Sequence, residues 1–215
     1  MKCNLDSESK QLTSISFICD NSGAEFLHDL LLADFLLFHR FCDKIYLHVK
    51  LYPTYVSDVT REDVDLHVGH LFIQTSRHSE LKEFYDRISH YLSAHLIEVV
   101  ESHFWNTALM FNQMTTCETG LLCYQLFQKD ALTFIKGDAN YRRVVSCRKW
   151  KPSTPLKDVV DYFPTSFVLL RTMKSDAVIG VPEETAVQLD KTDEHWRHNG
   201  KRGLIQFFHK NLQKK

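Results

Sequence analysis

Apolar residues occur in two alternating patterns along the chain, and together these patterns predict an α/β protein. Residues 14–19 form a continuous apolar and β-branched run that ends at polar Asp20, which is typical of a buried parallel strand. Apolar residues between Phe26 and Leu36 then recur near a 3.6-residue period, as in a helix that packs on a sheet. Ser22 and Glu25 have the spacing of a capping box at the start of this helix.

The same alternation continues to the end of the chain. It predicts further strands at residues 44–49, 54–57, 132–135, 167–170, 177–181 and 204–208. It also predicts one helix that begins at Val59 or Thr60. Four further helices are predicted at residues 76–102, 120–129, 155–162 and 182–189, with a loop at 103–118.

Strands joined by crossover helices form βαβ units, so we expect a doubly wound, mostly parallel sheet with helices on both faces. Ligands of such sheets bind beyond the carboxyl ends of the strands, where the strand order reverses. We expect one domain over residues 14–209, a poorly ordered lead-in at 1–13 and a basic tail at 210–215.

The composition narrows the class of protein. The 215 residues are 44% hydrophobic and 25% charged, as in ordinary soluble globular proteins. The formal net charge of -1 argues against nucleic acid or an anionic membrane as a partner. The apolar segment 30–38 is too short to span a bilayer. None of the six cysteines forms a C-x-x-C pair, which favours reduced thiols and a cytoplasmic or nuclear protein.

Polar residues with oxygen donors follow three of the predicted strands. Asp20 and Asn21 follow the first, Asp58 follows the strand at 54–57, and Asp138 and Asn140 follow the strand at 132–135. Carboxylate and amide oxygens suit Mg²⁺ or Mn²⁺. A structural explanation is also open, because Asp20 and Asn21 can form a turn and Asp58 can cap the next helix.

Cationic residues occupy the same predicted edge. Lys136 and Arg171 directly follow buried strands, so we expect their charged ends to emerge there, near Arg142 and Lys174. Such groups recognise phosphate, and a hard metal beside fixed cations is typical of phosphoryl transfer. The alternative for Arg142 and Arg143 is a solvated helix face, which we favour for Arg143.

Other chemistries find little support in the sequence. The pairs His67/His70 and His195/His198 lack the H-E-x-x-H arrangement of zinc enzymes. The sequence contains no G-x-S-x-G elbow and no G-x-G-x-x-G or G-x-x-x-x-G-K loop. We expect Phe104 and Trp105 to pack in the core.

Four segments stand in a distinctive order. Residues 20–26 read Asp-Asn-Ser-Gly-Ala-Glu-Phe, 56–58 read Val-Ser-Asp, 136–143 read Lys-Gly-Asp-Ala-Asn-Tyr-Arg-Arg, and 171–174 read Arg-Thr-Met-Lys. Together they resemble the motifs of the metal-dependent damage-control phosphatases. The last segment resembles the R-T-x-K motif of one subfamily, which is described as sugar-phosphate phosphatases and also as S-adenosylmethionine-dependent protein-glutamate O-methyltransferases. The middle segment 67–119 matches the family poorly.

This resemblance implies roles for individual residues. Asp20, Asn21 and Asp58 would hold a metal, with Mn²⁺, Ni²⁺ or Co²⁺ among the expected ions, and would form the catalytic set with Lys174. Glu25 would match a position assigned to the methyl donor. The residues that would lie against the substrate are Asp138, Asn140, Tyr141 and Arg142, to which our own interpretation adds Lys136 and Arg171.

The leading hypothesis is hydrolysis of a phosphomonoester of a small sugar phosphate, of the fructose 1-phosphate type, with a small phosphorylated metabolite as the only partner. A metal-activated water is the expected nucleophile, and an aspartyl-phosphate route through Asp20 ranks second. One alternative is methyl transfer from S-adenosylmethionine to a protein substrate. The other is a non-catalytic metal-binding module, because only thirteen residues precede the first strand, where the family carries a long helical region.

Overall fold

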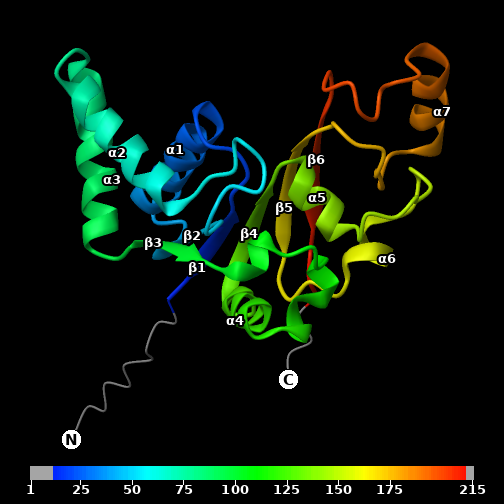
Figure 1. Ribbon diagram of the computed structural model, residues 1–215, viewed down its shortest axis with the longest axis horizontal. Helices are drawn as coiled ribbons and strands as arrows, with labels where there is room; N and C mark the ends of the chain where they lie inside the picture. Colours follow the sequence, from blue (N-terminus) through cyan, green and yellow to red (C-terminus); the bar gives the residue numbers. More distant parts are fainter. Residues whose placement is uncertain (1–11, 212–215) are drawn as a thin grey trace, which may run out of the picture.

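A computed structural model describes residues 12–211 and shows one six-stranded sheet in the order β3-β2-β1-β4-β5-β6 (Figure 1). The strands are β1 (Ser14–Ile18), β2 (Lys44–Val49), β3 (Ile97–Glu101), β4 (Asp130–Lys136), β5 (Phe167–Thr172) and β6 (Gly203–Phe208). All neighbouring pairs are parallel except β5 and β6, which are antiparallel. The α/β, mostly parallel sheet is confirmed.

Seven α-helices and three short 3₁₀-helices surround the described sheet. The α-helices are α1 (Ala24–Phe38), α2 (Arg61–Thr75), α3 (Lys82–Ser93), α4 (Glu118–Phe127), α5 (Asp138–Val144), α6 (Leu156–Val160) and α7 (Glu183–Thr192). The 3₁₀-helices are η1 (Ser79–Leu81), η2 (His103–Asn106) and η3 (Phe111–Thr116). None of these helices is both long and apolar enough to cross a membrane.

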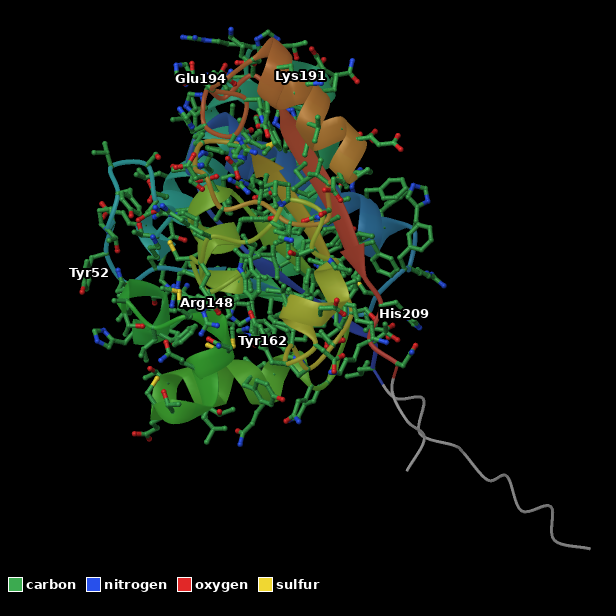
Figure 2. All side chains as sticks on the ribbon, turned by 90° about the vertical axis from the view of Figure 1, so that its right-hand side faces the viewer. Tyr52, Arg148, Tyr162, Lys191, Glu194 and His209 are labelled. Atoms are coloured by element: carbon green, nitrogen blue, oxygen red, sulfur yellow. The ribbon has the colours of Figure 1, made fainter. Side chains whose placement is uncertain are left out.

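The sheet separates two hydrophobic cores, because successive side chains of a strand point to opposite faces. Phe17 of β1 packs with Phe26 and Leu30 of α1 and with Ile88 of α3. Ile18, the next residue, packs in the other core with elements that include η2, α4 and α5. Figure 1 shows α1, α2 and α3 beside the β1–β3 half, and α5 and α6 beside β4 and β5. Figure 2 views the β6 edge, with α7 near the start of β6 and His209 just beyond its end.

The sequence pattern predicted one helix over residues 76–102, and this prediction is wrong. The helix α2 ends at Thr75, α3 ends at Ser93, and the segment Ile97–Glu101 is strand β3, which pairs with β2 in parallel. The β-branched Val99 and Val100 suit this strand, and its tertiary pairing outweighs the helical periodicity of the residues before it. The segment 103–118, predicted as a loop, contains η2 and η3.

Two predicted strands are wrong. Residues 54–57 form a turn, because the backbone amides of Thr54 and Tyr55 bond to Asp58 Oδ2 at 2.9 and 2.7 Å instead of to a strand. Residues 177–181 are irregular, although all of them except Gly180 are buried. The amide of Ile179 donates to Tyr141 Oη at 2.9 Å, and the amide of Gly180 donates to the carbonyl of Thr154 at 2.8 Å. Apolar burial alone therefore does not mark a strand here.

The helix starts also differ from the prediction in one case. Thr60 caps α2 in a capping box with Asp63, which confirms the predicted opening of that helix. The N-cap of α1 is instead Gly23, with no side-chain cap, and Ser22 Oγ donates to Asp63 Oδ1 at 3.1 Å. Ser22 and Glu25 thus do not form a capping box. The five cysteines in the described residues are free thiols, as expected. The predicted lead-in and basic tail lie largely outside the described residues.

The sequence analysis favoured a solvated helix face for Arg143, and this prediction is wrong. Its guanidinium donates to the carbonyls of Leu109, Trp105 and Phe104 at 2.9, 3.1 and 2.9 Å. Its charged end also lies 4.6 Å from the ring centroid of Phe104 and 5.1 Å from that of Phe111. Burial lowers the pKa of Arg143 to about 10. This one side chain therefore anchors the 104–109 segment to α5.

We expect Arg143→Met to lower the free energy of unfolding by about 2–4 kcal/mol, because three carbonyls lose a charged donor at once. Methionine keeps much of the contact with the aromatic rings. Urea denaturation checks this, with Arg148→Met as the matched control, since Arg148 is exposed and its side chain makes no hydrogen bond in the described residues (Figure 2). Equal stability of the two variants would contradict the anchoring role.

His48 makes the core sensitive to acid. It is 1% exposed, lies between the rings of Trp105 and Phe127, and bonds to Ser16 Oγ at 3.2 Å. Burial lowers the pKa of His48 from 6.5 to about 3. The folded protein therefore keeps His48 neutral while the unfolded chain takes up a proton below pH 6.5. This contribution to stability is present above that pH and is lost as the pH falls toward 3.

Between pH 7 and pH 5 the wild-type protein should lose about 2 kcal/mol of stability through His48 alone. His48→Gln removes the titrating group and retains a polar partner for Ser16, so its stability should depend less on pH in this range. Parallel urea titrations at the two pH values measure the difference. The idea fails if the wild type and the variant lose stability equally.

Candidate functional site

The strand order reverses between β1 and β4, so the carboxyl ends of these strands form the switch point where ligands of doubly wound sheets bind. A cavity of about 340 Å³ opens there, and we call it the first chamber. Its lining residues are Asp20, Asn21, Tyr55, Asp58, Asp138, Ala139, Arg142 and Lys174. The structure thus brings together residues from four separate segments, including all three predicted metal ligands.

The Asp20 carboxylate lies in a tight space between β1 and β4. A Cβ atom on Gly137 would stand 1.8 Å from Asp20 Oδ2, so only glycine leaves room for this carboxylate. Asp20 is 9% exposed. Burial, together with the nearby carboxylates of Glu25 and Asp58, raises the pKa of Asp20 to about 7. Concentrated negative charge here favours a bound cation.

Asn21 and Asp58 face each other through an isolated antiparallel bridge. Asp58 Oδ2 accepts from Lys50 Nζ at 2.5 Å and from two backbone amides, while Asp58 Oδ1 takes no hydrogen bond in the described residues. Asn21 Nδ2 donates to Asp20 Oδ2 at 2.7 Å, and Asn21 Oδ1 accepts from Ser57 Oγ at 2.6 Å. The amide of Asn21 is therefore hydrogen-bonded at both of its ends.

The donor set fits a hard divalent cation. Asp20 and Asp58 offer carboxylate oxygens and Asn21 offers an amide oxygen, which Mg²⁺ and Mn²⁺ prefer over nitrogen or sulfur. Within residues 12–211, no group of three His, Cys, Asp or Glu side chains is arranged to hold a metal. The two carboxylates would therefore depend on Asn21 as the third protein ligand.

Lys174 and Arg142 are the cations of the first chamber without a carboxylate partner. Lys174 is exposed, and its ammonium group makes no hydrogen bond or ion pair in the described residues. Arg142 Nη2 donates to Tyr55 Oη at 3.2 Å, and its buried Nε has no partner in the described chain. Both side chains therefore retain donors for an anion.

The sequence analysis predicted a free charge on Lys136 at the sheet edge, but this charge is paired. It lies at the end of β4, bonds to Asp29 Oδ1 and is 3.4 Å from Glu25 Oε1. Desolvation works against the charge of Lys136, but Asp29 and Glu25 outweigh it and raise the pKa of Lys136. Lys136 lines an adjoining cavity of about 350 Å³ with Glu25 and Asp20, where its charge is already balanced.

The charged end of Arg171 does not emerge at the edge either. Its side chain is 0% exposed, and it donates to Asp138 Oδ1 at 2.7 Å and to the carbonyls of Ser175 and Ala177. The guanidinium stacks 3.9 Å from the ring centroid of Tyr141. As placed, Arg171 supports Asp138, whose Oδ2 takes no hydrogen bond in the described residues.

Tyr141 and Asn140 are also buried supports as placed, and they do not line the first chamber. Tyr141 is 0% exposed and accepts from the amide of Ile179. Asn140 Nδ2 donates to the carbonyls of Cys19 and Lys136 at 3.1 and 2.9 Å, so it ties the ends of β1 and β4 together. Asn140 also lines a cavity that adjoins the first chamber. The contact of both residues with a substrate stays a prediction.

Glu25 connects Asn21 to Lys136. Its Oε2 accepts from Asn21 Nδ2 at 2.9 Å and its Oε1 lies 3.4 Å from Lys136 Nζ. It therefore orients a predicted metal ligand instead of capping its own helix. The methyl-donor role that the resemblance implies for Glu25 stays a prediction.

The sequence analysis did not identify three residues that belong to the site. Lys50 pairs with Asp58, Tyr55 bonds to Arg142, and the buried Asp29 balances Lys136. Lys50 follows β2 directly, so the rule that selected Lys136 and Arg171 would also have selected it. Asp29 is four residues after Glu25, which puts both carboxylates on one face of α1.

The sheet order and the chamber define a doubly wound α/β domain with an acidic and cationic site at its switch point. Residues 3–189 match the Damage-control phosphatase ARMT1-like domain. The chain belongs to the ARMT1-like damage-control phosphatase domain family.

Relatives named Damage-control phosphatase ARMT1 show similar levels of identity. The protein from Xenopus tropicalis is 30% identical over 204 residues, covering 94% of this chain and 46% of the relative. The mouse protein (Mus musculus) is 32% identical over 199 residues, covering 90% and 43%. The human protein is 29% identical over 216 residues, covering 95% and 46%. The chain thus spans a little under half the length of these relatives.

We expect Gly137→Ala to destabilise the protein by about 2 kcal/mol more than Gly200→Ala, because overpacking adds to backbone strain. Both glycines have positive φ, +84° and +73°, so both variants carry the strain of about 1–2 kcal/mol that an L-residue meets there. Only at Gly137 would the new Cβ collide with Asp20, since nothing lies within 4 Å of the position at Gly200. Thermal unfolding of both variants tests this, and equal losses would contradict the close approach of Asp20.

Proposed function

We propose that this chain hydrolyses phosphomonoesters of small sugar phosphates in a reaction that needs a divalent metal. The observation that carries the proposal is the first chamber, where Asp20, Asp58 and Asp138 face two cations with free donors. Carboxylates that can hold a hard metal, together with cations for phosphate oxygens, are the groups that phosphoryl transfer requires. Membership of a phosphatase family supports the same reaction class.

Asp20, Asn21 and Asp58 would hold the ion, with Mn²⁺, Ni²⁺, Co²⁺ or Mg²⁺ as candidates. When bound, such an ion stabilises charge on phosphoryl oxygens and lowers the pKa of a bound water. Lys50 holds Oδ2 of Asp58, and Oδ1 takes no hydrogen bond in the described residues. Glu25 and Ser57 fix the amide plane of Asn21 through hydrogen bonds at its two ends.

The remaining groups act on the substrate itself. Lys174 and Arg142 would neutralise the phosphate oxygens, with Lys174 as a mobile point charge and Arg142 as a planar fork. Asp138, held by Arg171, keeps Oδ2 free to accept from a sugar hydroxyl or to orient the attacking water. As the water oxygen bonds to phosphorus and the water gives up a proton, the ester P–O bond breaks and the departing sugar oxygen takes up one proton, so the proton count balances.

The test uses the full chain with p-nitrophenyl phosphate and Mn²⁺. We expect chelation by EDTA to abolish release of p-nitrophenol and added Mn²⁺ to restore it. Asp58→Asn should lower kcat/KM by about 100-fold or more, because a lost charge at the metal removes transition-state stabilisation. Asp65→Asn is the matched control, since Asp65 is exposed and its side chain makes no hydrogen bond in the described residues.

Lys174→Met guards against a trivial folding defect, because this exposed side chain has no structural contact to lose. It should raise KM or lower kcat/KM while the unfolding temperature stays unchanged. The proposal is wrong if Asp58→Asn, with its fold verified by circular dichroism, releases p-nitrophenol as fast as the wild type.

A further inference from the structure

A second cavity of about 340 Å³ adjoins the first chamber, and we call it the second chamber. It shares Tyr55, Ala139 and Arg142 with the first chamber. Its far wall comes from the segment 105–110, which Arg143 anchors through the three carbonyl bonds described above. A ligand that occupies the first chamber therefore has an adjacent space into which it can extend past Arg142.

The charges that line the two chambers differ. The first chamber contains the three carboxylates of Asp20, Asp58 and Asp138. The described residues that line the second chamber include Lys50, Arg142 and Arg143 but no aspartate or glutamate. Lys50 is paired with Asp58, whereas neither arginine has a carboxylate partner in the described part of the chain. The second chamber is therefore suited to an anion that needs no metal.

Hydrogen-bond donors without acceptors also favour an anion as the ligand of the second chamber. Arg142 Nε is buried and has no hydrogen-bond partner among residues 12–211. The same holds for Nε1 of Trp105, a residue that also lines the second chamber and is 4% exposed. Buried donors without acceptors are uncommon because they lose their hydration without compensation. Arg142 lines the second chamber, so an anionic ligand there is the acceptor that its side chain lacks in the described residues.

We propose that the second chamber binds a second anionic group, a phosphate or a carboxylate, of the same substrate whose phosphoester lies in the first chamber. This inference rests on the proposed function, and it names the substrate class as phosphorylated sugars that carry a further negative charge. Arg142 stands at the junction and can contact both groups. Arg143 is the second cation, and it also holds the wall in place.

The test compares three ligands by calorimetric titration of the full chain in the presence of Mn²⁺. Fructose 1,6-bisphosphate carries a second phosphate, 6-phosphogluconate carries a carboxylate, and fructose 1-phosphate carries neither. We expect the first or the second to bind about tenfold tighter than fructose 1-phosphate, as a charge-assisted contact provides. The ligand that gains affinity identifies which anion the chamber takes.

Substitutions at Ala108 test whether a gain in affinity comes from the second chamber or from contact between the second anionic group and the metal. Ala108 lines the second chamber and not the first, and it is exposed at the edge of the wall. Ala108→Glu places a negative charge there and should abolish the preference for a second anion. Ala108→Gln has a similar size without the charge and should retain the preference.

Equal affinity for all three ligands, or a preference that persists in Ala108→Glu, would overturn the second-anion site. Hydrolysis of p-nitrophenyl phosphate, measured on the same preparations, tests the proposed function separately. Turnover without a preference rejects only the second chamber. A preference without turnover of any ester rejects the phosphatase proposal and leaves the anion site supported.

Discussion

The Asp20 carboxylate approaches the backbone of Gly137 closely at the point where the strand order of the sheet reverses. Asp20 lies just beyond β1 and Gly137 follows β4, two strands that pair in parallel, so the contact brings a carboxylate against the backbone where the two strands end. Asn140 strengthens the same junction by binding the carbonyls of Cys19 and Lys136. Without a side chain at Gly137, a carboxylate can be buried at the point where the sheet leaves an opening. The rest of the site is arranged around that carboxylate.

The cations of the site fall into two sets, which are buried cations paired with carboxylates and more exposed cations without a carboxylate partner in the described residues. Lys136 and Arg171 are deeply buried, and each is neutralised by a neighbouring carboxylate. Lys174 and Arg142 lie nearer to the surface and have no carboxylate partner in the described residues. The buried pairs set the positions of Glu25 and Asp138, whereas the unpaired cations remain available to a ligand. Unpaired charge is affordable only where water or a ligand can reach it.

The sequence was sufficient to predict a mostly parallel sheet, a site at its switch point and most of the residues around the first chamber, but not every strand. Apolar runs that end in Asp20 or Lys136 place those residues at strand ends, and parallel strands bring their ends together. Strand β3 was missed because its pairing with β2 is a tertiary fact that local periodicity does not contain. The strand predicted at 54–57 was wrong for a related reason, since the Asp58 side chain captures the amides that a strand would use.

The direction of a charged side chain was harder to predict than its position along the chain. Arg171 and Lys174 are three residues apart, yet one is fully buried against Tyr141 and the other is exposed. The partners of Arg171 come from α5 and from the loop after β5, which the sequence pattern does not place. The same limit applies to Arg143, whose acceptors lie in the segment 104–109.

Under the proposed function, that segment would influence which substrate binds and would leave the reacting groups in place. The first chamber is built almost entirely from the segments that resemble family motifs, whereas the far wall of the second chamber comes from residues 105–110, outside those four segments. Arg142 belongs to a motif segment and lines both chambers. Under the proposed function, a change in residues 105–110 would therefore alter the surroundings of the rest of the substrate without moving Asp20, Asn21 or Asp58. Since Arg143 holds this wall through backbone carbonyls, the wall can change its side chains and keep its position.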